Sequence, residues 1–365
     1  MAAATEQNPK RLFLVSIPRT ASNLFVKVIN ILNQPNVFTN EKAGYFFYPA
    51  LVSASAKNFF NTPLDKWTDE MKTEMRQLYQ QCFDNLEAAS AEARDKGKLM
   101  FTKEHAFWFV NPAFMLEVLP DPSANGSGEV TARSHQESFR LTMPEAYGPS
   151  ETFSPLNKTL LSDEYLRTWQ FAFLIRHPAL AWPSMYRAMM NLSSKLHMMD
   201  EDGIKGAMLS NMTWKWTRYL FDWCREQSGG STVPLVLDAH DVIHNQEVVL
   251  QFCDRAGLDR SAVQFEWDDG KQGVPSGWTA GKQNGESGGP DGAPDVSKEA
   301  AKIMTSTLVA SKGIIKDKAP AAVDIDAEVE KWKAEFGPEA AGLIEKTVRD
   351  AMPDYEYLRE FRLKV

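Results

Sequence analysis

Glycine is absent from the stretch of this sequence that most suggests a phosphate-binding loop. Residues Ser16–Phe25 read SIPRTASNLF and follow the apolar run Leu12–Val15. A proline, the cation Arg19 and small hydroxyl residues thus lie between a predicted strand and a predicted amphipathic helix. The G-x-x-x-x-G-K-[ST] pattern of ATP-binding loops does not occur here. Any phosphate held by this loop is therefore bound with a different chemistry.

Positive charge is also scarce. The chain has 40 Lys and Arg residues against 48 Asp and Glu residues, which gives a net charge of −8. A protein that binds nucleic acid usually has a broad basic face. We therefore expect no nucleic-acid partner, and any anion site must be local.

Cysteines are few and long apolar runs are missing. Cys82, Cys224 and Cys253 are odd in number and widely spaced, which argues against a disulfide framework or a zinc site. No segment reaches the roughly 18 uninterrupted apolar residues of a membrane span. The first residues, MAAATEQNPK, lack the apolar core of a signal peptide. These features predict a cytoplasmic protein with no bound metal and no membrane partner.

Short apolar runs alternate with helical patterns. The runs typical of buried strands are Leu12–Val15, Leu99–Thr102, Phe171–Ile175 and Pro234–Leu237. The sets with helical spacing are Leu24, Val28 and Leu32; Trp216, Leu220 and Trp223; and Val249, Phe252, Cys253 and Ala256, followed by Gly257 as a C-cap. This alternation predicts an α/β fold, with a mainly parallel central sheet flanked by helices in three layers and ligands at the carboxyl ends of the strands.

The chain reads as one domain. We expect residues 1–10 to form a tail and residues 11–365 a single α/β domain with insertions at about 120–155 and 279–296, both rich in Gly, Ser and Pro. The insertions could be lids or disordered loops. From Ser297 onward the composition predicts surface helices. The Trp-rich stretch Asn211–Cys224 could be a homodimer face, although apolar residues at helical spacing are more often core.

The SIPRTASNLF loop can bind an anion through its backbone. At a helix start, capped here by Ser22 or Asn23, backbone N–H groups lack intrahelical partners and the helix dipole favours negative charge. The dipole contributes only about 0.3–1 kcal/mol at an exposed site. A tight phosphate site therefore also needs Arg19, whose guanidinium can bind two oxygens at once. On its own, the stretch is equally compatible with an ordinary strand–helix turn.

A second candidate site lies in Phe171–Arg187, FAFLIRHPALAWPSMYR. Arg176 follows the predicted strand, and Ser184 comes eight residues later, on the first turns of a predicted helix. The charge of one and the hydroxyl of the other could bind a second phosphate. The plain alternative is a salt-bridged surface arginine and a serine without a role. Two anion sites on adjacent strand ends would suit a nucleotide that is phosphorylated at two places.

The third candidate is Phe101–Phe109, FTKEHAFWF. A short strand is expected to end in Lys103, and His105 follows it. Histidine is a reasonable general base for a hydroxyl because its ordinary pKa lies near neutrality, although a lone histidine is more often structural. The three aromatic residues that follow could form an apolar wall for an acceptor molecule: Phe107, Trp108 and Phe109.

Taken in their order along the chain, which is Ser16–Phe25, Phe101–Phe109 and Phe171–Arg187, the three motifs resemble those of the sulfotransferases that use 3′-phosphoadenosine 5′-phosphosulfate (PAPS). The fold of that family is related to that of the P-loop kinases. The resemblance runs from about residue 11 to 260 and implies a P-loop-type fold, PAPS as co-substrate and no metal. It also implies which residues bind the nucleotide: the loop Pro18, Arg19, Thr20, Ala21, Ser22 and Asn23 at the 5′-phosphosulfate, and Arg176 and Ser184 at the 3′-phosphate.

Two positions depart from the family pattern. The usual glycine of the loop is Ala21, which restricts the backbone. The family's last nucleotide motif, an R-K-G-x-x-G stretch, is echoed only by Ser311, Lys312 and Gly313, with Lys316 where a second glycine would stand. The variant loop and the insertions suggest a specialised branch, of the kind associated with fungal secondary metabolism.

The reaction that the resemblance implies is in-line transfer of a sulfuryl group from PAPS to a hydroxyl of an apolar small molecule. His105 would take the hydroxyl proton, while Arg19 and Lys103 would stabilise charge on the leaving phosphate. The acceptor would lie against Phe107, Trp108 and Phe109 and against the GYFFY stretch Gly44–Tyr48, with Phe46, Phe47 and Tyr48 as the contacts. Since a sulfated hydroxyl is a good leaving group, sulfation could be followed by elimination.

Two other readings stay open. A nucleotide-dependent kinase would use the same kind of fold, but the Lys-Ser/Thr pair of a Walker loop is not in SIPRTASNLF. A non-catalytic binding protein of the sulfotransferase fold would keep a nucleotide or partner site and could dispense with His105. The missing loop glycine is the feature that favours this second reading.

Overall fold

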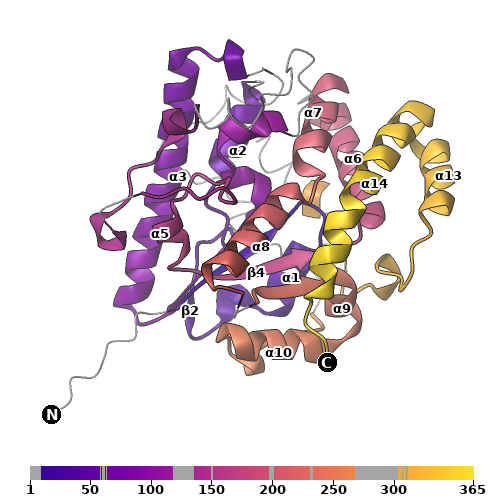
Figure 1. Cartoon of the computed structure of the whole chain (residues 1–365). Coiled ribbons are helices and arrows are strands. Elements are labelled where there is room, and N and C mark those ends of the chain that lie inside the picture. The colour runs from indigo at the N-terminus through magenta and orange to yellow at the C-terminus, as the bar shows by residue number, and fades with distance from the viewer. Residues whose placement is uncertain are drawn as a thin grey trace, which may run out of the picture.

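A parallel sheet forms the centre of the protein (Figure 1). The computed structural model describes residues 10–57, 59, 62, 64–117, 135–148, 151–196, 201–230, 233–267, 303–305, 308 and 311–365. Within them the sheet has five strands in the order β2-β3-β1-β4-β5, and each adjacent pair is parallel. The strands are β1 (Arg11–Ser16), β2 (Val37–Phe38), β3 (Leu99–His105), β4 (Gln170–Ile175) and β5 (Leu235–Asp238).

The sheet buries both faces because its strands are apolar on both sides. In β1, Phe13 and Val15 belong to one hydrophobic cluster, and Leu12 and Leu14 belong to the other. The first cluster includes side chains of α2 (Tyr48–Ala56), α3 (Asp69–Asp95), α6 (Pro178–Leu196), α7 (Glu201–Asn211), α8 (Lys215–Gln227), α13 (Ile325–Phe336) and α14 (Pro338–Glu360). The second includes side chains of α1 (Ser22–Val28), α9 (Ala239–His244) and α10 (Gln246–Ala256). The predicted three-layer α/β fold is confirmed.

All four predicted strands are present, but one is longer than expected. We expected the strand that begins at Leu99 to end near Lys103, with His105 after it. Instead this strand, β3, continues to His105 and is buried along its whole length. Lys103 and His105 are therefore held by strand pairing and not by a loop. The two-residue strand β2 was not predicted, because two residues are too short to show a period.

The predicted helical sets have mixed outcomes. The set Leu24, Val28 and Leu32 is wrong as one helix, since α1 ends at Val28 and the chain turns at Asn30, with φ 51°. The helix around Trp216 is confirmed as α8. The helix of Val249–Ala256 is confirmed as α10, with Gly257 as its left-handed C-cap at φ 77°.

The C-terminal helices do more than cover the surface. The prediction of surface helices is wrong for α14, because Ile344, Val348 and Leu358 on this helix are fully buried in the main core cluster. The backbone N–H of Leu363, just after the helix, donates to the carbonyl of Val236 in β5 (2.8 Å). The tryptophans of Asn211–Cys224 are also buried core residues.

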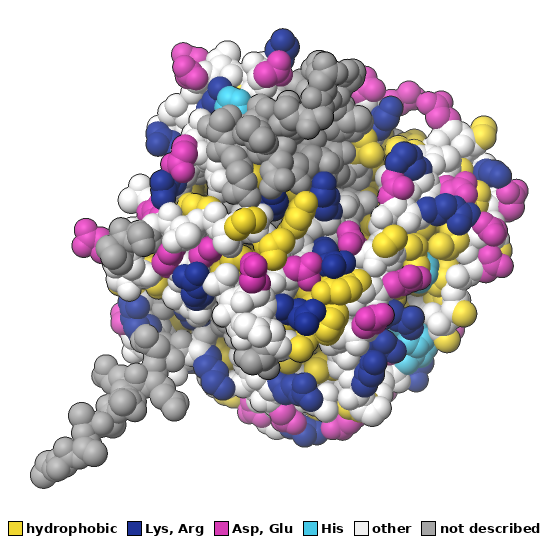
Figure 2. All heavy atoms as spheres, in the orientation of Figure 1, with side chains coloured by type: hydrophobic (Ala, Val, Ile, Leu, Met, Phe, Trp, Pro, Cys, Tyr) yellow, Lys and Arg dark blue, Asp and Glu magenta, His cyan; other side chains and the backbone are white. Residues whose placement is uncertain are grey.

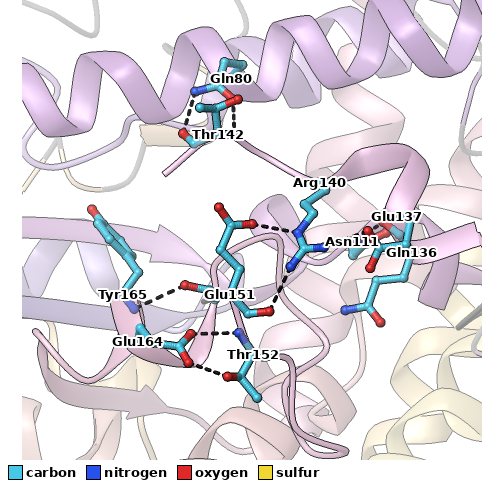
Figure 3. Close-up of polar contacts among 11 residues, drawn as sticks. Gln80, Asn111, Gln136, Glu137, Arg140, Thr142, Glu151, Thr152, Glu164 and Tyr165 are labelled. Atoms are coloured by element: carbon cyan, nitrogen blue, oxygen red, sulfur yellow. Dashed lines mark hydrogen bonds and ion pairs between the residues drawn. The ribbon is translucent and has the colours of Figure 1, made fainter. Parts of the chain in front are cut away.

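Part of the first predicted insertion is fixed against α3. Of residues 120–155, the structure describes 135–148 and 151–155. As Figure 3 shows, the side-chain amide of Gln80 on α3 donates to the carbonyl of Thr142 and accepts from its backbone N–H. Arg140 donates to the carboxylate of Glu151 (2.6 Å). Thr152 in turn donates through its backbone to Glu164 (2.8 Å). The second predicted insertion, 279–296, lies outside the described residues.

Gly44 lets the loop after β2 reach the end of β3. Its carbonyl accepts from the backbone N–H of Lys103 (3.0 Å) and from the hydroxyl of Thr102 (2.8 Å). Its φ of +105° is accessible mainly to glycine, and a Cβ atom at this position would lie 2.5 Å from the Lys103 nitrogen. This contact places the GYFFY stretch beside the carboxyl end of β3. Within the described residues, no helix is long and apolar enough to cross a membrane.

Replacing Gly44 by alanine should destabilise the protein strongly. We expect Gly44→Ala to lower the free energy of unfolding by about 3 kcal/mol or more, since backbone strain and a clash with β3 act together. Gly97→Ala is the matched control, because Gly97 also has positive φ (+63°) but has open space around it. The control should lose about 1–2 kcal/mol. Equal losses in urea denaturation would contradict the proposed close approach.

Candidate active site

The carboxyl ends of β1 and β3 bring the first two site residues together. Ser16 and His105 are register partners in this parallel pair, so their side chains emerge side by side on the same face of the sheet. The Ser16 hydroxyl and Nδ1 of His105 lie 2.9 Å apart. The contact follows from strand register, which is why the sequence alone gave no role to Ser16.

His105 is a buried imidazole with a second hydroxyl partner. The phenol oxygen of Tyr45 lies 2.9 Å from its Nε2, and the ring of Trp108 meets the imidazole edge to face at 4.5 Å. Burial, and then the nearby charge of Lys103, hold the pKa of His105 well below its usual 6.5. At neutral pH the imidazole is therefore uncharged and able to accept a proton.

Lys103 and Glu104 leave the same strand on opposite faces. The Lys103 ammonium donates to Oδ1 of Asn23 (2.6 Å), which belongs to the phosphate-type loop Ser16–Phe25. It also lies 4.1 Å from the centre of the Tyr45 ring. Glu104 accepts the backbone N–H groups of Phe46 and Phe47. Burial lowers the pKa of Lys103 to about 7 and raises the pKa of Glu104 to about 8. These two ionisable neighbours thus tie two separate loops to one strand end.

The loop without glycine adopts a conformation that glycine would favour. Ala21 is the N-cap of α1 and is left-handed, with φ 64° and ψ 20°, and Arg19 also has positive φ (67°). No side chain caps this helix, so the predicted capping by Ser22 or Asn23 is wrong. The Thr20 hydroxyl bonds inward, to the carbonyl of Ile17 (2.9 Å). Ala21 therefore takes a left-handed conformation that glycine adopts without penalty, at a cost of about 1–2 kcal/mol.

The structure brings together the three predicted anion-binding residues. Nε of Arg19 donates to the Ser184 hydroxyl (3.0 Å), and Nη1 of Arg176 donates to the carbonyl of Arg19 (2.8 Å). Ser184 lies on α6, as the sequence indicated. The two anion sites that we expected on adjacent strand ends are therefore one continuous cluster.

Two cations that sequence reasoning missed complete this cluster. Arg187 lies one turn beyond Ser184 on α6 and pairs with Glu335 (2.6 Å), and Lys318 comes from the C-terminal part of the chain. Burial, and then the charge of Arg19, lower the pKa of Arg176 to about 10. Burial, and then the charges of three arginines, lower the pKa of Lys318. The cations repel one another, so a bound anion would relieve that repulsion.

The clustering of positive charge is local. On the face shown in Figure 2, acidic and basic side chains are interspersed with hydrophobic ones. Arg19 and Arg176 hydrogen-bond to hydroxyl and backbone carbonyl oxygens, and Nε of Arg176 is buried with no partner among the residues that the structure describes. An unpaired buried donor of this kind is costly unless a ligand satisfies it.

A single cavity of about 1030 Å³ joins these parts. Of the predicted site residues, those that line it are Pro18, Arg19, Ala21, Ser22, Asn23, Tyr48, His105, Trp108, Arg176, Ser184 and Gly313. The apolar part of the wall comes mainly from α2, α6 and α7 and includes Leu51, Val52, Leu180, Met189, Leu192 and Ala207.

Four predicted wall residues lie elsewhere. Phe46, Phe47, Phe107 and Phe109 do not line the cavity and are buried in the main core cluster. Phe107 and Phe109 lie in the 3₁₀ turn η4 (Ala106–Phe109), and Phe109 packs on Phe13 with 5.1 Å between ring centres. The backbone of Phe46 and Phe47 is held by Glu104. Of the aromatic wall proposed from the sequence, only Trp108 and Tyr48 face the cavity.

Three further predicted residues act behind the cavity wall. Thr20 and Lys103 support the loop through the bonds described above, and neither is among the lining residues. Lys312 accepts through its carbonyl from the backbone N–H of Trp267 (3.2 Å), while its neighbour Gly313 reaches the wall. In the part of the chain that the structure describes, no group of three or more His, Cys, Asp or Glu side chains could hold a metal ion.

A neutral imidazole and an arginine cluster that open on one cavity are the parts of a transferase that handles an anionic group. No protein-family model matches the chain. The protein named Sulfotransferase ppzF from Metarhizium majus (strain ARSEF 297) is 33% identical to it over 380 residues, which cover 99% of each chain. The Sulfotransferase ppzF of Metarhizium rileyi (strain RCEF 4871) is 32% identical over 372 residues, covering 98% of this chain and 97% of the relative.

A solved structure, the sulfotransferase domain from the Synechococcus PCC 7002 olefin synthase, is 12% identical, with 91% of this chain and 96% of that one covered and a TM-score of 0.37. The full-length identity to the two fungal proteins decides the family. The chain belongs to the sulfotransferases, as a divergent member with fungal relatives. The family resemblance seen in the sequence is confirmed.

Restoring the family's glycine should stabilise the loop. We expect Ala21→Gly to raise the free energy of unfolding by up to about 1 kcal/mol, because the relief of left-handed strain exceeds the extra entropy of glycine in the unfolded chain. Ala179→Gly, at a buried position in α6, is the control and should lose about 1 kcal/mol. A loss for Ala21→Gly in urea denaturation would show that the loop does not need the left-handed conformation.

Proposed function

We propose that this sulfotransferase uses PAPS and transfers its sulfuryl group to a hydroxyl on a largely apolar small molecule. The observation that carries the proposal is that the neutral His105 and the Arg19–Arg176 cluster face the same cavity. When bound, PAPS supplies an activated sulfuryl group next to a phosphate leaving group. The protein then has to position two ligands, stabilise charge and accept one proton.

The cationic cluster fits a nucleotide that is phosphorylated twice. Nε of Arg176 is buried with no partner among the described residues, and Arg176 donates to the carbonyl of Arg19, whose side chain donates to Ser184, which suits a phosphate that accepts both charged and neutral donors. Arg19 lies in the loop after β1, where the resemblance places the 5′-phosphosulfate. Lys103 reaches the same loop through Asn23. These residues would hold the two phosphorylated ends of PAPS on adjacent strands.

The remaining space suits an apolar acceptor. A cavity of about 1030 Å³ lies at the upper end of the roughly 300–1,000 Å³ usual for ligand pockets, which leaves room for an acceptor beside the nucleotide. Met185, Met189 and Leu192 on α6 give this region an apolar wall, and methionine adapts to irregular shapes. A fungal secondary metabolite that loses its sulfate by elimination after transfer would also fit this proposal.

The first test is nucleotide binding. We expect isothermal titration with 3′-phosphoadenosine 5′-phosphate to show binding by the wild type, and Arg176→Ala to weaken it by about 10- to 150-fold, since hydrogen bonds to charged groups contribute about 1.5–3 kcal/mol. Arg260→Ala, which removes an exposed arginine paired with Asp254 outside the cavity, should leave binding unchanged. No binding by the wild type would refute PAPS use, and tighter binding of ATP would favour a kinase.

The second test is the role of His105. His105→Ala should keep nucleotide binding and lower sulfate release from PAPS by about 10²- to 10⁴-fold, because a general base contributes that much. His135→Ala, outside the cavity wall, should have no effect. Since the pKa of His105 is held well below 6.5, the wild-type rate should not fall as the pH is lowered to 6.5. Full turnover by His105→Ala would remove His105 from the base role.

A further inference from the structure

We propose that Tyr45 is a catalytic residue that carries the acceptor's proton to His105. The inference rests on the proposed sulfuryl transfer and goes beyond it, because it assigns the contact with the acceptor hydroxyl to a phenol and not to the imidazole. Sequence reasoning gave Tyr45 no role of its own within GYFFY.

Both nitrogens of His105 are occupied by protein hydroxyls. Nδ1 lies 2.9 Å from the Ser16 hydroxyl, and Nε2 lies 2.9 Å from the Tyr45 phenol. A neutral imidazole has one N–H donor and one acceptor nitrogen. If Nδ1 donates to Ser16, then Tyr45 donates its O–H to Nε2. Tyr45 and His105 both line the cavity wall, and because Nε2 is already paired with the phenol, an acceptor hydroxyl at this wall can give its proton to the Tyr45 oxygen.

Tyr45 is fixed in this position from both sides. Its carbonyl accepts from the side-chain amide of Asn40 (2.7 Å), and the preceding Gly44 pairs with β3. After it, the N–H groups of Phe46 and Phe47 bond to the buried Glu104. The side chain is 3% exposed, with the indole of Trp108 4.9 Å from its ring centre. Tyr45 is therefore held too firmly to move aside in each turnover, so the acceptor molecule must pass its proton through the Tyr45 hydroxyl.

The electrostatic surroundings suit a relay. Burial holds the pKa of Tyr45 well above 10, so at neutral pH the phenol has a proton to give. The Lys103 ammonium, 4.1 Å from the ring centre, favours the negative charge that develops on the phenol oxygen if its proton leaves first. The neutral His105 next to it is ready to take that proton.

The step balances in protons and electron pairs. The acceptor oxygen forms a bond to sulfur while the bond from sulfur to the 5′-phosphate oxygen breaks, and that electron pair stays on the leaving phosphate. The acceptor's proton moves to the Tyr45 oxygen as the Tyr45 proton moves to Nε2 of His105. Tyr45 is a phenol again at the end, and His105 is an imidazolium that later returns its proton to solvent.

The test compares Tyr45→Phe with Tyr186→Phe, which removes a phenol on α6 that packs on Phe336 and does not line the cavity. The probes are sulfate release from PAPS with water as acceptor and transfer to 2-naphthol. We expect Tyr45→Phe to lower kcat by about 10²-fold or more, with the KM for PAPS and the binding of 3′-phosphoadenosine 5′-phosphate changed less than threefold. Tyr186→Phe should keep kcat within threefold.

A proton inventory in mixed H₂O and D₂O separates a relay from a structural role. The wild type should give a curved plot of rate against deuterium fraction, since two protons move in one step, and Tyr45→Phe should give a straight one. If the wild type neither binds the nucleotide nor turns over PAPS, the proposed function and this inference both fail. If the wild type is active and Tyr45→Phe keeps or exceeds its kcat, only the relay is refuted, because Tyr45 then merely blocks His105.

Discussion

The carboxyl end of β3 is the constraint on which the site depends. Lys103, Glu104 and His105 are consecutive in a strand, so the first and third point to one face of the sheet and the second to the other. One face meets the phosphate-type loop and Ser16, while the other holds the backbone of Phe46 and Phe47. Pairing with β1 fixes all three at once, and a shift of one residue would exchange the two roles.

Burying these three ionisable side chains costs folding free energy. A buried charge without full compensation destabilises a fold, and here burial moves the pKa of Lys103, Glu104 and His105 toward their neutral forms. Perturbed ionisable groups of this kind gather at functional sites. Burial keeps the imidazole of His105 neutral, which is the form that can accept a proton.

The sequence revealed what depends on local pattern. Four apolar runs predicted four strands, and the Arg176–Ser184 spacing placed both residues beside Arg19. Contacts that depend on register or on distant segments could not be predicted: Tyr45 on His105, and Lys318 in the cation cluster. Most of the predicted aromatic wall does not line the cavity: Phe107 and Phe109 lie in a 3₁₀ turn that decides which ring faces it, and the FTKEHAFWF motif carries no signal for that turn. Likewise, no pattern shows that an alanine will adopt a left-handed conformation.

The arginines can bind an anion without giving up their structural contacts. Arg19 donates to the carbonyl of Met304 (2.6 Å) and Arg176 to that of Lys318 (2.7 Å), so both hold the C-terminal part of the chain against the loop. A guanidinium has five N–H donors. Among the described residues, Arg19 donates to Ser184 and to the carbonyl of Met304, and Arg176 donates to the carbonyls of Arg19 and Lys318. The other donors can meet phosphate oxygens. Because the same groups order the cavity wall and carry the charge, an anion that binds here meets a site that is already assembled.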